Sequence, residues 1–326
     1  MSKNVLVTGG AGYIGSHTCK ILDKNGYNPI VYDNLSRGNK WAVKWGNLVV
    51  GDIINYRKLS RAFNKYNPIG VIHFAAYAYV GESIDHPKRY YRNNVKGTIN
   101  LLEAMIDNNI DNIIFSSTCA TYGEPNNIPI SEGHPQNPIN PYGKSKYMIE
   151  KIMNDYSEYY DFNHVSLRYF NAAGADTDTE IGEAHDPETH LIPLVIKAAN
   201  GEKENIEIYG TDYDTKDGTC VRDYIHVNDL GRAHLMSMEH LIEGGGSEIF
   251  NIGNGEGYSV KEIINAVEKV SNQKINRIES DRRKGDPAVL IADNSKIKGQ
   301  LNWSPKIKDI ESIIETVWKW QKNRSF

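Results

Sequence analysis

Cysteine is scarce in this sequence, and no apolar stretch is long enough to cross a bilayer. The three cysteines, Cys19, Cys119 and Cys220, are scattered over 326 residues and form no Cys-x-x-Cys pair. That distribution argues against a disulfide framework and against structural zinc. The N-terminal segment also lacks the apolar run and small-residue cleavage site of a signal peptide. We therefore expect a cytoplasmic protein.

The chain also lacks a strong excess of charge. Its 37 Lys and Arg residues nearly balance 41 Asp and Glu residues, which gives a formal net charge of −4. Such a balance provides no general attraction to nucleic acids or to anionic membranes, so any phosphate-binding site has to be built locally. The length suffices for one large or two smaller hydrophobic cores.

What the sequence does contain is an alternation of short apolar segments and longer amphipathic ones over its first half. The short segments are predicted to be buried strands: Asn4–Thr8, Pro29–Tyr32, Leu48–Val50, Val71–Ala75, Ile113–Ser116 and Val165–Arg168. Strands that alternate with helices imply right-handed crossovers, and so an α/β fold with a Rossmann-type, doubly wound parallel sheet. Further along, the patterns predict strands at Val221–Asp223 and Ile249–Ile252 and helices at residues 228–241 and 310–321.

The composition changes after Phe170, and this change suggests a second domain. Residues 171–220 are richer in Gly, Asp, Thr and Glu, which is typical of loops that hold a polar ligand. We expect two interleaved domains. The nucleotide-binding domain comprises residues 1–171 and about 221–252, and a smaller mixed α/β domain of residues 172–220 and 253–326 binds the substrate.

A glycine-rich motif follows the first predicted strand and opens a helix. In such a setting Gly9 permits a tight turn, Gly12 lets a pyrophosphate approach the backbone, and Gly15 lets the helix pack closely on the strand. Asp33 follows 18 residues after Gly15, at the end of the second predicted strand. A carboxylate there accepts hydrogen bonds from a ribose 2′-OH and repels a 2′-phosphate, so we predict NAD rather than NADP. Arg37 is a contrary hint, but we interpret it as a surface arginine.

Other predicted cofactor contacts lie near the ends of the following strands. The third strand closes with Asp52 and Ile53, and small residues after the fourth leave room for a cofactor. We interpret His73 there as a structural histidine, and Asn93 as either a cofactor contact or a buried capping residue. The predicted contacts beyond the glycines and Asp33 are Tyr13, Ile14, Asn34, Asp52, Ile53, Phe74, Ala75, Ala76, Asn93 and Ser116.

A tyrosine and a lysine four residues apart, Tyr142 and Lys146, lie in the segment Asn140–Lys146. Pro141 can start a helix, because its missing N–H would be unsatisfied in the first turn anyway. The pair then shares one helix face. Since a neighbouring ammonium favours the phenolate, we predict that Lys146 lowers the pKa of Tyr142 from its ordinary value near 10. An activated tyrosine beside a bound nicotinamide can move a proton and a hydride off one carbinol carbon.

With these motifs the chain resembles the extended short-chain dehydrogenase/reductase superfamily, and within it the UDP-glucose 4-epimerases, above all those that supply bacterial surface polysaccharides. The resemblance runs nearly from end to end. The blocks that carry it are residues 116–123, 141–146, 168–175 and 217–227.

This resemblance implies reversible 4-epimerisation of UDP-glucose and UDP-galactose with bound NAD. Tyr142 would take the proton of the sugar 4-hydroxyl, Lys146 would assist it and contact the nicotinamide ribose, and Thr118 would bridge the tyrosine and the 4-oxygen. Tyr169 would lie near the nicotinamide. The 4-keto sugar would turn over and receive the hydride on its other face. The family also implies a homodimer formed by helices near residues 90–108 and 140–160.

The resemblance also assigns the residues that bind the UDP-sugar. Asn171 and Arg222 would hold the diphosphate, Tyr209 would stack on uracil, and Arg283 and Asp286 would bind the second phosphate and the ribose. Without the resemblance, residues 281–286 would be interpreted as a solvated charge cluster. The assigned substrate residues are Thr118, Tyr142, Asn171, His190, Leu191, Tyr209, Arg222, Arg283 and Asp286.

Several alternatives remain open at this point. His185 and His190 lie near Glu183 but do not share a helix face, so we predict loop or nucleotide contacts and no metal site. A dehydratase or decarboxylase of the same fold is disfavoured, because Cys119 and Ala120 cannot transfer the required proton. Epimerases of UDP-xylose/UDP-arabinose or of UDP-N-acetylglucosamine share the mechanism and stay possible. A non-catalytic relative is disfavoured by the intact Thr118, Tyr142 and Lys146.

Overall fold

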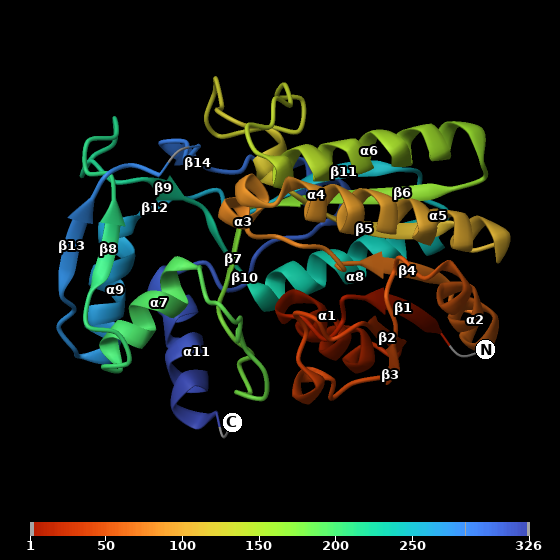
Figure 1. The fold of residues 1–326 in the computed structure, drawn as a ribbon, viewed down its shortest axis with the longest axis horizontal. Coiled ribbons are helices and arrows are strands. Elements are labelled where there is room, and N and C mark those ends of the chain that lie inside the picture. Colours follow the sequence, from red (N-terminus) through yellow and green to blue (C-terminus); the bar gives the residue numbers. More distant parts are fainter. Residues whose placement is uncertain (1–2, 284, 325–326) are drawn as a thin grey trace.

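The computed structural model describes residues 3–283 and 285–324, and its centre is a seven-stranded parallel sheet (Figure 1). The strand order is β11-β6-β5-β4-β1-β2-β3, and every neighbouring pair is parallel. The strands are β1 (Asn4–Thr8), β2 (Asn28–Asp33), β3 (Asn47–Val50), β4 (Gly70–His73), β5 (Asn112–Thr118), β6 (Asn163–Tyr169) and β11 (Glu248–Ile252). The predicted Rossmann-type, doubly wound sheet is confirmed.

Alternating side chains of the strands feed two separate cores, one on each face of the sheet. In β1, Val5 and Val7 join one core while Leu6 joins the other, as the period of two in a strand requires. Helices α1 (Tyr13–Lys24) and α8 (Val227–Ile242) cover the first face. Helices α2 (Tyr56–Tyr66), α5 (Gly97–Asp107) and α6 (Pro141–Tyr159) cover the second. No helix among residues 3–283 and 285–324 is long and apolar enough to span a membrane.

A short helical run precedes α5 on the second face of the sheet. It consists of α3 (Val80–Asp85), α4 (Pro87–Tyr90) and a π-helical turn at Tyr91–Lys96 that leads directly into α5. In that turn the buried asparagine is Asn94, whose amide bonds both to the N–H and to the carbonyl of Tyr77. Asn93 is left facing the cavity described below. Asn94, and not Asn93, therefore has the buried structural role that the sequence analysis considered for Asn93.

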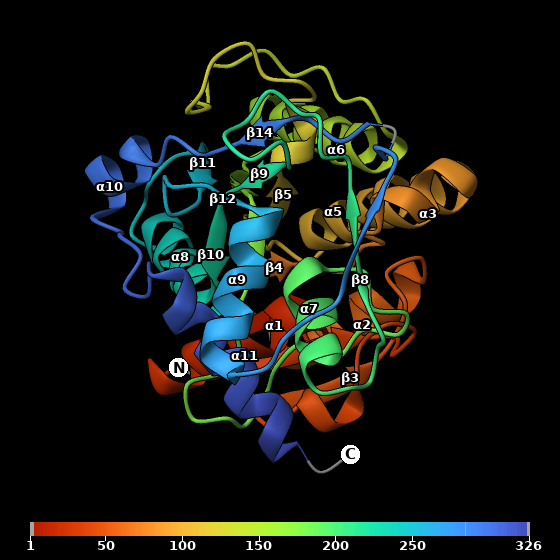
Figure 2. The ribbon, with the colours of Figure 1, turned by 90° about the vertical axis from the view of Figure 1, so that its left-hand side faces the viewer.

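The smaller part of the molecule lies beside the sheet and faces the viewer in Figure 2. Helices α7 (Leu191–Ala199), α9 (Val260–Ser271) and α11 (Ile310–Asn323) share its core. Its short sheets pair β8 (Ile206–Tyr209) with β13 (Arg277–Ser280), and β9 (Val221–Arg222) with β12 (Tyr258–Ser259) and β14 (Val289–Leu290). Near the main sheet, β7 (Asn171–Ala173) pairs with β10 (Tyr224–His226), and α10 (Ser295–Leu301) packs on β11.

Two predicted strands differ from the structure in instructive ways. Strand β9 ends at Arg222, one residue before the predicted end at Asp223. Asp223 lies between β9 and β10, where its buried carboxylate accepts N–H bonds from Asn254, Gly255 and Ala292 at 2.7, 2.9 and 3.1 Å. The predicted extension of the fourth strand to Ala75 is wrong, since β4 ends at His73. His73 itself is structural as predicted: its ring nitrogens lie 2.6 and 2.8 Å from the hydroxyls of Thr8 and Thr98.

Buried histidines give the fold a predictable sensitivity to acid. Burial lowers the pKa of His73 to about 3 and those of His17, His164, His226 and His234 to about 4. In the unfolded chain the imidazole pKa is near 6.5, so below that pH the unfolded state binds more protons than the folded state. The free energy of unfolding should therefore fall as pH decreases from about 6.5 to about 4, by up to about 1.4 kcal/mol per pH unit for each histidine.

Urea unfolding at several pH values between about 7.5 and 5 would measure this slope. Asp223 has the opposite effect on the free energy of unfolding. Burial raises its pKa to about 6, so below that pH its carboxyl binds a proton more readily in the folded state than in the unfolded state. Burial likewise raises the pKa values of the Asp33, Asp111 and Glu132 carboxyls. These four carboxyls are still fewer than the five imidazoles, so the net slope stays positive. An unfolding midpoint that is constant or rises on acidification would contradict the prediction.

Candidate active site

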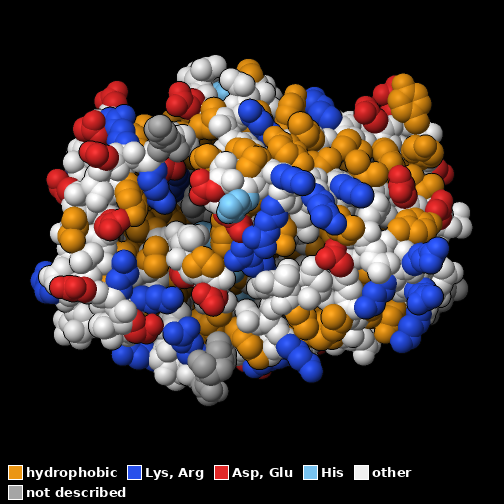
Figure 3. Space-filling model, in the orientation of Figure 1, with side chains coloured by type: hydrophobic (Ala, Val, Ile, Leu, Met, Phe, Trp, Pro, Cys, Tyr) orange, Lys and Arg blue, Asp and Glu red, His pale blue; other side chains and the backbone are white. Residues whose placement is uncertain are grey.

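A cavity of about 420 Å³ lies at the carboxyl ends of the central strands, where ligands of doubly wound sheets bind. Figure 3 shows this face hollowed near its middle, with basic side chains beside the hollow. The cavity wall combines the glycine-rich loop, the ends of β2, β4, β5 and β6, the start of α6 and the segment around Asp286. It brings together most of the predicted site residues: Gly9, Gly12, Tyr13, Ile14, Gly15, Asp33, Asn34, Ile53, Phe74, Ala75, Ala76, Asn93, Ser116, Thr118, Tyr142, Lys146, Tyr169, Asn171, His190, Arg222 and Asp286.

The glycine-rich loop forms a cradle that no other residue type could form. Gly9 has a positive φ of +72°, and a Cβ at Gly15 would lie 2.3 Å from the Gly9 carbonyl oxygen. Helix α1 starts directly after this loop, with no acidic residue in its first turn and no side-chain cap on Gly12. Its N-terminal N–H groups therefore remain available for an anion, and the cradle fits the pyrophosphate of a dinucleotide.

The end of β2 presents an oriented carboxylate. Asp33 is buried, and its two oxygens accept N–H bonds from Ala11 at 3.0 Å and from Leu35 at 2.8 Å. Burial raises the pKa of Asp33, whereas these two bonds favour its charged form. The predicted contact Asp52 lies outside the cavity wall, and its carboxylate accepts a 2.9 Å hydrogen bond from the Asn34 amide. Asp52 thus positions a cavity residue.

Arg37 differs from its interpretation as a surface arginine. It lines the cavity, where its guanidinium forms a 2.8 Å ion pair with Glu82 and lies over the ring of Tyr79. Glu82 also forms a 2.7 Å ion pair with Arg89, so one carboxylate is shared between two guanidiniums. The preference for NAD therefore rests on Asp33 rather than on the pairing of Arg37.

The start of α6 places Tyr142 and Lys146 against the end of β5. Pro141 is the first residue of this helix, and the Asn140 side chain caps it by accepting the Gly143 N–H at 2.8 Å. The predicted helix start is therefore confirmed. Lys146 donates a 2.7 Å hydrogen bond to the Ser116 carbonyl. The three residues Thr118, Tyr142 and Lys146 line one part of the cavity and are all buried.

The pKa of Tyr142 differs from the sequence-based prediction. Burial raises it to about 12, which a hydrogen bond with Thr118 partly counteracts. Burial also lowers the pKa of Lys146 to about 7, so the lysine itself tends to lose its charge in this pocket. In the protein alone, desolvation of the phenolate therefore outweighs the assistance expected from Lys146.

A second tyrosine closes the same end of the cavity. The Tyr169 hydroxyl, at the end of β6, is hydrogen-bonded to the Ser116 hydroxyl, and burial raises the Tyr169 pKa. Ser116 therefore contacts two side chains at this end of the cavity through different atoms: its carbonyl accepts a hydrogen bond from Lys146, and its hydroxyl is hydrogen-bonded to Tyr169. This arrangement fixes the positions of the lysine and of the aromatic wall beside it.

At the far end of the cavity, ion pairs join Asp286 to Arg222 and to Arg283, whose side chain is 60% exposed. Asp286 lies 3.8 Å from the Arg222 guanidinium and 3.3 Å from that of Arg283. The Arg283 guanidinium in turn stacks over the ring of Tyr209, 4.6 Å from its centroid. Tyr209 and Arg283 lie outside the cavity wall but reach it through Asp286. Leu191 packs against the core of the smaller part, and its predicted role in binding substrate stays a prediction.

The sequence analysis named His185, His190 and Glu183 but did not predict that they meet as one group in the cavity wall. The segment from Glu183 to His190 is irregular rather than helical, so the rule that excluded a shared helix face does not apply to it. His185 and His190 lie side by side, with ring centroids 5.2 Å apart, and both contact Glu183. The only sequence signal for this group was the local density of His and Glu. Irregular segments have no periodicity from which such a contact could be predicted.

Comparison with known proteins agrees with this geometry. Residues 5–253 match the NAD dependent epimerase/dehydratase family. The chain belongs to this family. It is 50% identical over 324 residues to the UDP-glucose 4-epimerase of Rhizobium meliloti (strain 1021), a match that covers 99% of this chain and 98% of the relative.

Solved structures from the family are equally similar. The UDP-glucose 4-epimerase from Brucella ovis in complex with NAD has a TM-score of 0.95 and 51% identity, with 98% of each chain covered. The enzyme from Bifidobacterium longum in complex with NAD+ and UDP has a TM-score of 0.94 and 39% identity, again with 98% of each chain covered.

Proposed function

We propose that this protein is an NAD-dependent UDP-glucose 4-epimerase that interconverts UDP-glucose and UDP-galactose. The observation that carries this proposal is one continuous cavity that joins the glycine cradle, the group Thr118, Tyr142 and Lys146, and the basic end at Arg222. A dinucleotide and a nucleotide-sugar can then meet at the tyrosine. The nearly full-length likeness to UDP-glucose 4-epimerases supports the same function.

The chemistry follows from what each side chain can do. NAD, when bound, would supply a nicotinamide that accepts the hydride from C4 of the sugar. Its positive charge would also favour the phenolate form of Tyr142. Tyr142 removes the proton of the 4-hydroxyl, and Thr118 holds that oxygen and the phenol together. Lys146 is fixed by Ser116 at 2.7 Å and can assist the tyrosine when protonated. Because C4 of the sugar is first oxidised and then reduced, the cycle has no net redox change.

The basic end of the cavity serves to anchor the nucleotide while the sugar turns. Arg222 and Arg283 offer planar forked donors that suit a diphosphate, and Tyr209 offers an aromatic surface for a base. Asp286 holds both guanidiniums in place. An anchored UDP is what allows the 4-keto sugar to present its other face without leaving the protein.

The structure disfavours a dehydratase, which needs an acid–base residue where this cavity has Cys119 and Ala120. Burial raises the pKa of the Cys119 thiol to about 12, so it is a poor proton donor and a poor nucleophile at neutral pH. The methyl side chain of Ala120 has no ionisable proton to transfer. Elimination of water is therefore not supported at this site.

Two further features of the molecule belong to the same proposal. The nucleotide-binding domain comprises residues 1–171 and about 221–252, and the smaller domain comprises residues 172–220 and 253–326.

The protein forms a homodimer through its α5 and α6 helices. Exposed apolar side chains on α6, Met148 at 43% and Tyr159 at 75%, support this interface. Light scattering on wild type and on Met148→Glu would test the dimer.

The function is tested by incubating the purified protein with UDP-galactose, without added cofactor, and separating the UDP-sugars by anion-exchange chromatography. A UDP-glucose peak supports 4-epimerisation with retained NAD. Parallel incubations with UDP-N-acetylglucosamine and UDP-xylose set the range of sugars. If UDP-glucose does not form even with NAD⁺ supplied, the glucose/galactose assignment is wrong, and turnover of one of the other sugars would replace it.

A further inference from the structure

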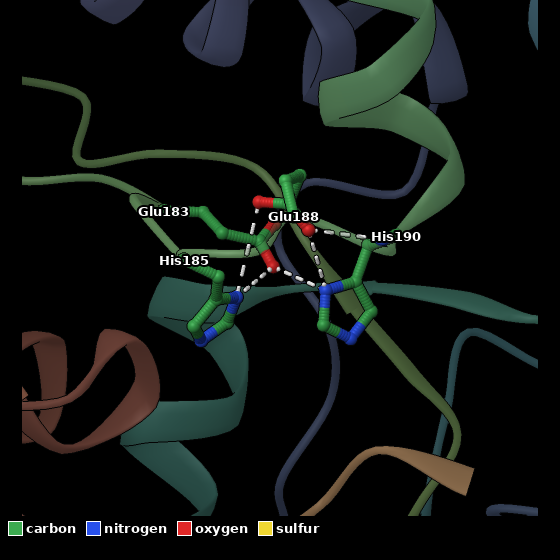
Figure 4. Close-up of side chains that lie close together, drawn as sticks. All are labelled: Glu183, His185, Glu188 and His190. Atoms are coloured by element: carbon green, nitrogen blue, oxygen red, sulfur yellow. Dashed lines mark hydrogen bonds and ion pairs between the residues drawn. The ribbon is translucent and has the colours of Figure 1, made fainter. Parts of the chain in front are cut away.

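Four potential metal ligands converge on one point in the wall of the cavity. They are the side chains of Glu183, His185, Glu188 and His190, whose ligand atoms all lie within 4.8 Å of one another (Figure 4). All four come from one irregular segment of the chain that leads into α7. Both carboxylates are nearly fully buried, with side-chain exposures of 4% for Glu183 and 3% for Glu188.

The distances between the donor atoms fit a tetrahedral cation. The Glu183 carboxylate lies 2.9 Å from His185 Nδ1 and 2.8 Å from His190 Nδ1. The Glu188 carboxylate lies 3.0 Å from His190 Nδ1 and 3.9 Å from His185 Nδ1. Ligands bound to zinc at about 2.0–2.1 Å in a tetrahedron are separated by about 3.3 Å. The four separations between carboxylate oxygens and Nδ1 atoms range from 2.8 to 3.9 Å and so fall on both sides of the tetrahedral value.

Proton sharing alone explains this arrangement poorly. An imidazole Nδ1 carries at most one proton, yet His190 Nδ1 faces oxygens of both Glu183 and Glu188. One oxygen of the Glu183 carboxylate lies close to the Nδ1 atoms of both His185 and His190. A central cation would instead satisfy every lone pair that points inward. A single divalent ion would also neutralise both buried carboxylates without requiring the two imidazoles beside them to be protonated.

Contacts around the cluster hold its members in place. One oxygen of Glu188 accepts backbone N–H bonds from Thr189 at 2.8 Å and His190 at 2.9 Å, which orients the carboxylate. The His185 ring packs edge-on against the rings of Tyr13 and Tyr79. Such outer contacts typically orient metal ligands. Since His185 and His190 also line the cavity, an ion can reach the cluster from solvent.

We propose that Glu183, His185, Glu188 and His190 form a divalent-metal site, and that zinc is the cation it fits best. Imidazole nitrogens with carboxylates at four positions suit zinc, whereas magnesium and calcium prefer six or more oxygen ligands. Because all four positions come from the protein, the site has the closed character of a structural metal. It would fasten the segment that carries His190 to the cavity wall, independently of the sugar chemistry.

A second cluster provides a matched control. Asp176, Asp178 and Glu180 also converge, but on the ammonium group of Lys20, at 2.7, 2.8 and 2.6 Å. The point on which they converge is therefore already occupied by a cationic group of the protein itself. We assign no metal to this cluster, and its carboxylates should not contribute to zinc binding.

The test uses tag-free protein loaded with zinc sulfate, dialysed against metal-free buffer and analysed by mass spectrometry for bound metal. Wild type should retain about one zinc ion per chain, as a closed four-ligand site requires. His185→Gln/His190→Gln should weaken zinc binding by more than about tenfold, while Asp178→Asn/Glu180→Gln should bind it like wild type. Circular dichroism verifies that each variant folds.

A measurement on wild type alone covers the case in which the histidine variant does not fold. X-ray absorption at the zinc edge should show two imidazoles with oxygen ligands and no sulfur. Failure of wild type to retain zinc, sulfur among its ligands, or unchanged binding in a folded histidine variant would each overturn the site. Each readout is independent of turnover, so an absence of epimerase activity would leave this result standing.

Discussion

Tyr142→Phe should lose about 10²–10⁴-fold in turnover, the range that a positioned acid–base group contributes. The substitution removes one oxygen atom and leaves the ring in a buried pocket, so packing is kept. Burial raises the pKa of this phenol to about 12, which means that its folded environment already disfavours a stray phenolate. Without the hydroxyl, the phenolic oxygen that Thr118 contacts, and with it the proposed proton acceptor, is lost.

The measurement is turnover of UDP-galactose, together with binding of NAD and UDP by calorimetry. Affinity for both ligands should change little, because the cradle and the basic end are untouched. Tyr258→Phe is the matched control, since Tyr258 lies on β12, outside the cavity wall and away from α5 and α6, and it should turn over like wild type. Near-normal turnover of Tyr142→Phe would show that the proton takes another route.

Arg168→Met should reduce the free energy of unfolding by about 3–5 kcal/mol, the usual effect of removing one partner from a buried ion pair. The Arg168 guanidinium forms two bonds with the Glu150 carboxylate, at 3.0 and 2.7 Å, and both side chains are almost fully buried. It also donates to the Tyr122 hydroxyl at 3.0 Å. After the substitution, Glu150 remains as a buried charge without its counter-ion.

Urea unfolding monitored by circular dichroism measures the loss. The double variant Glu150→Gln/Arg168→Met removes both charges and should recover part of the stability, which a double-mutant cycle would quantify. Lys269→Met serves as the comparison, because Lys269 pairs with Glu311 at the surface with 70% exposure, and its loss of stability should be much smaller than that of Arg168→Met. A loss of that small size for Arg168→Met would disprove the structural importance of the buried pair.

Much of the fold was predictable because it depends on periodic patterns. Buried parallel strands are continuous apolar runs, and those runs located most of the central sheet. The error at the fourth strand shows the limit of this approach. Phe74 and Ala75 continue the apolar pattern beyond His73 but line the cavity, and composition alone does not distinguish an apolar strand from an apolar cavity wall.

The site was predictable where one short motif contains the chemistry, and less so where distant segments meet. The Tyr142–Lys146 spacing places both groups on one helix face. The stack of Arg283 on Tyr209 instead depends on the pairing of β8 with β13, which sequence spacing does not reveal. The pKa of Tyr142 depends on burial, which only the packed structure provides.

The order of strands in the sheet also constrains how the chain is synthesised. Strand β6 pairs with β5 on one side and with β11 on the other, and β11 begins only at Glu248. While the ribosome makes the intervening segment, the nascent sheet therefore ends in an open edge at β6, although β6 is almost entirely buried in the finished protein. Open apolar edges promote aggregation. Translation of the residues between β6 and β11 is thus the interval in which the growing chain most depends on chaperones.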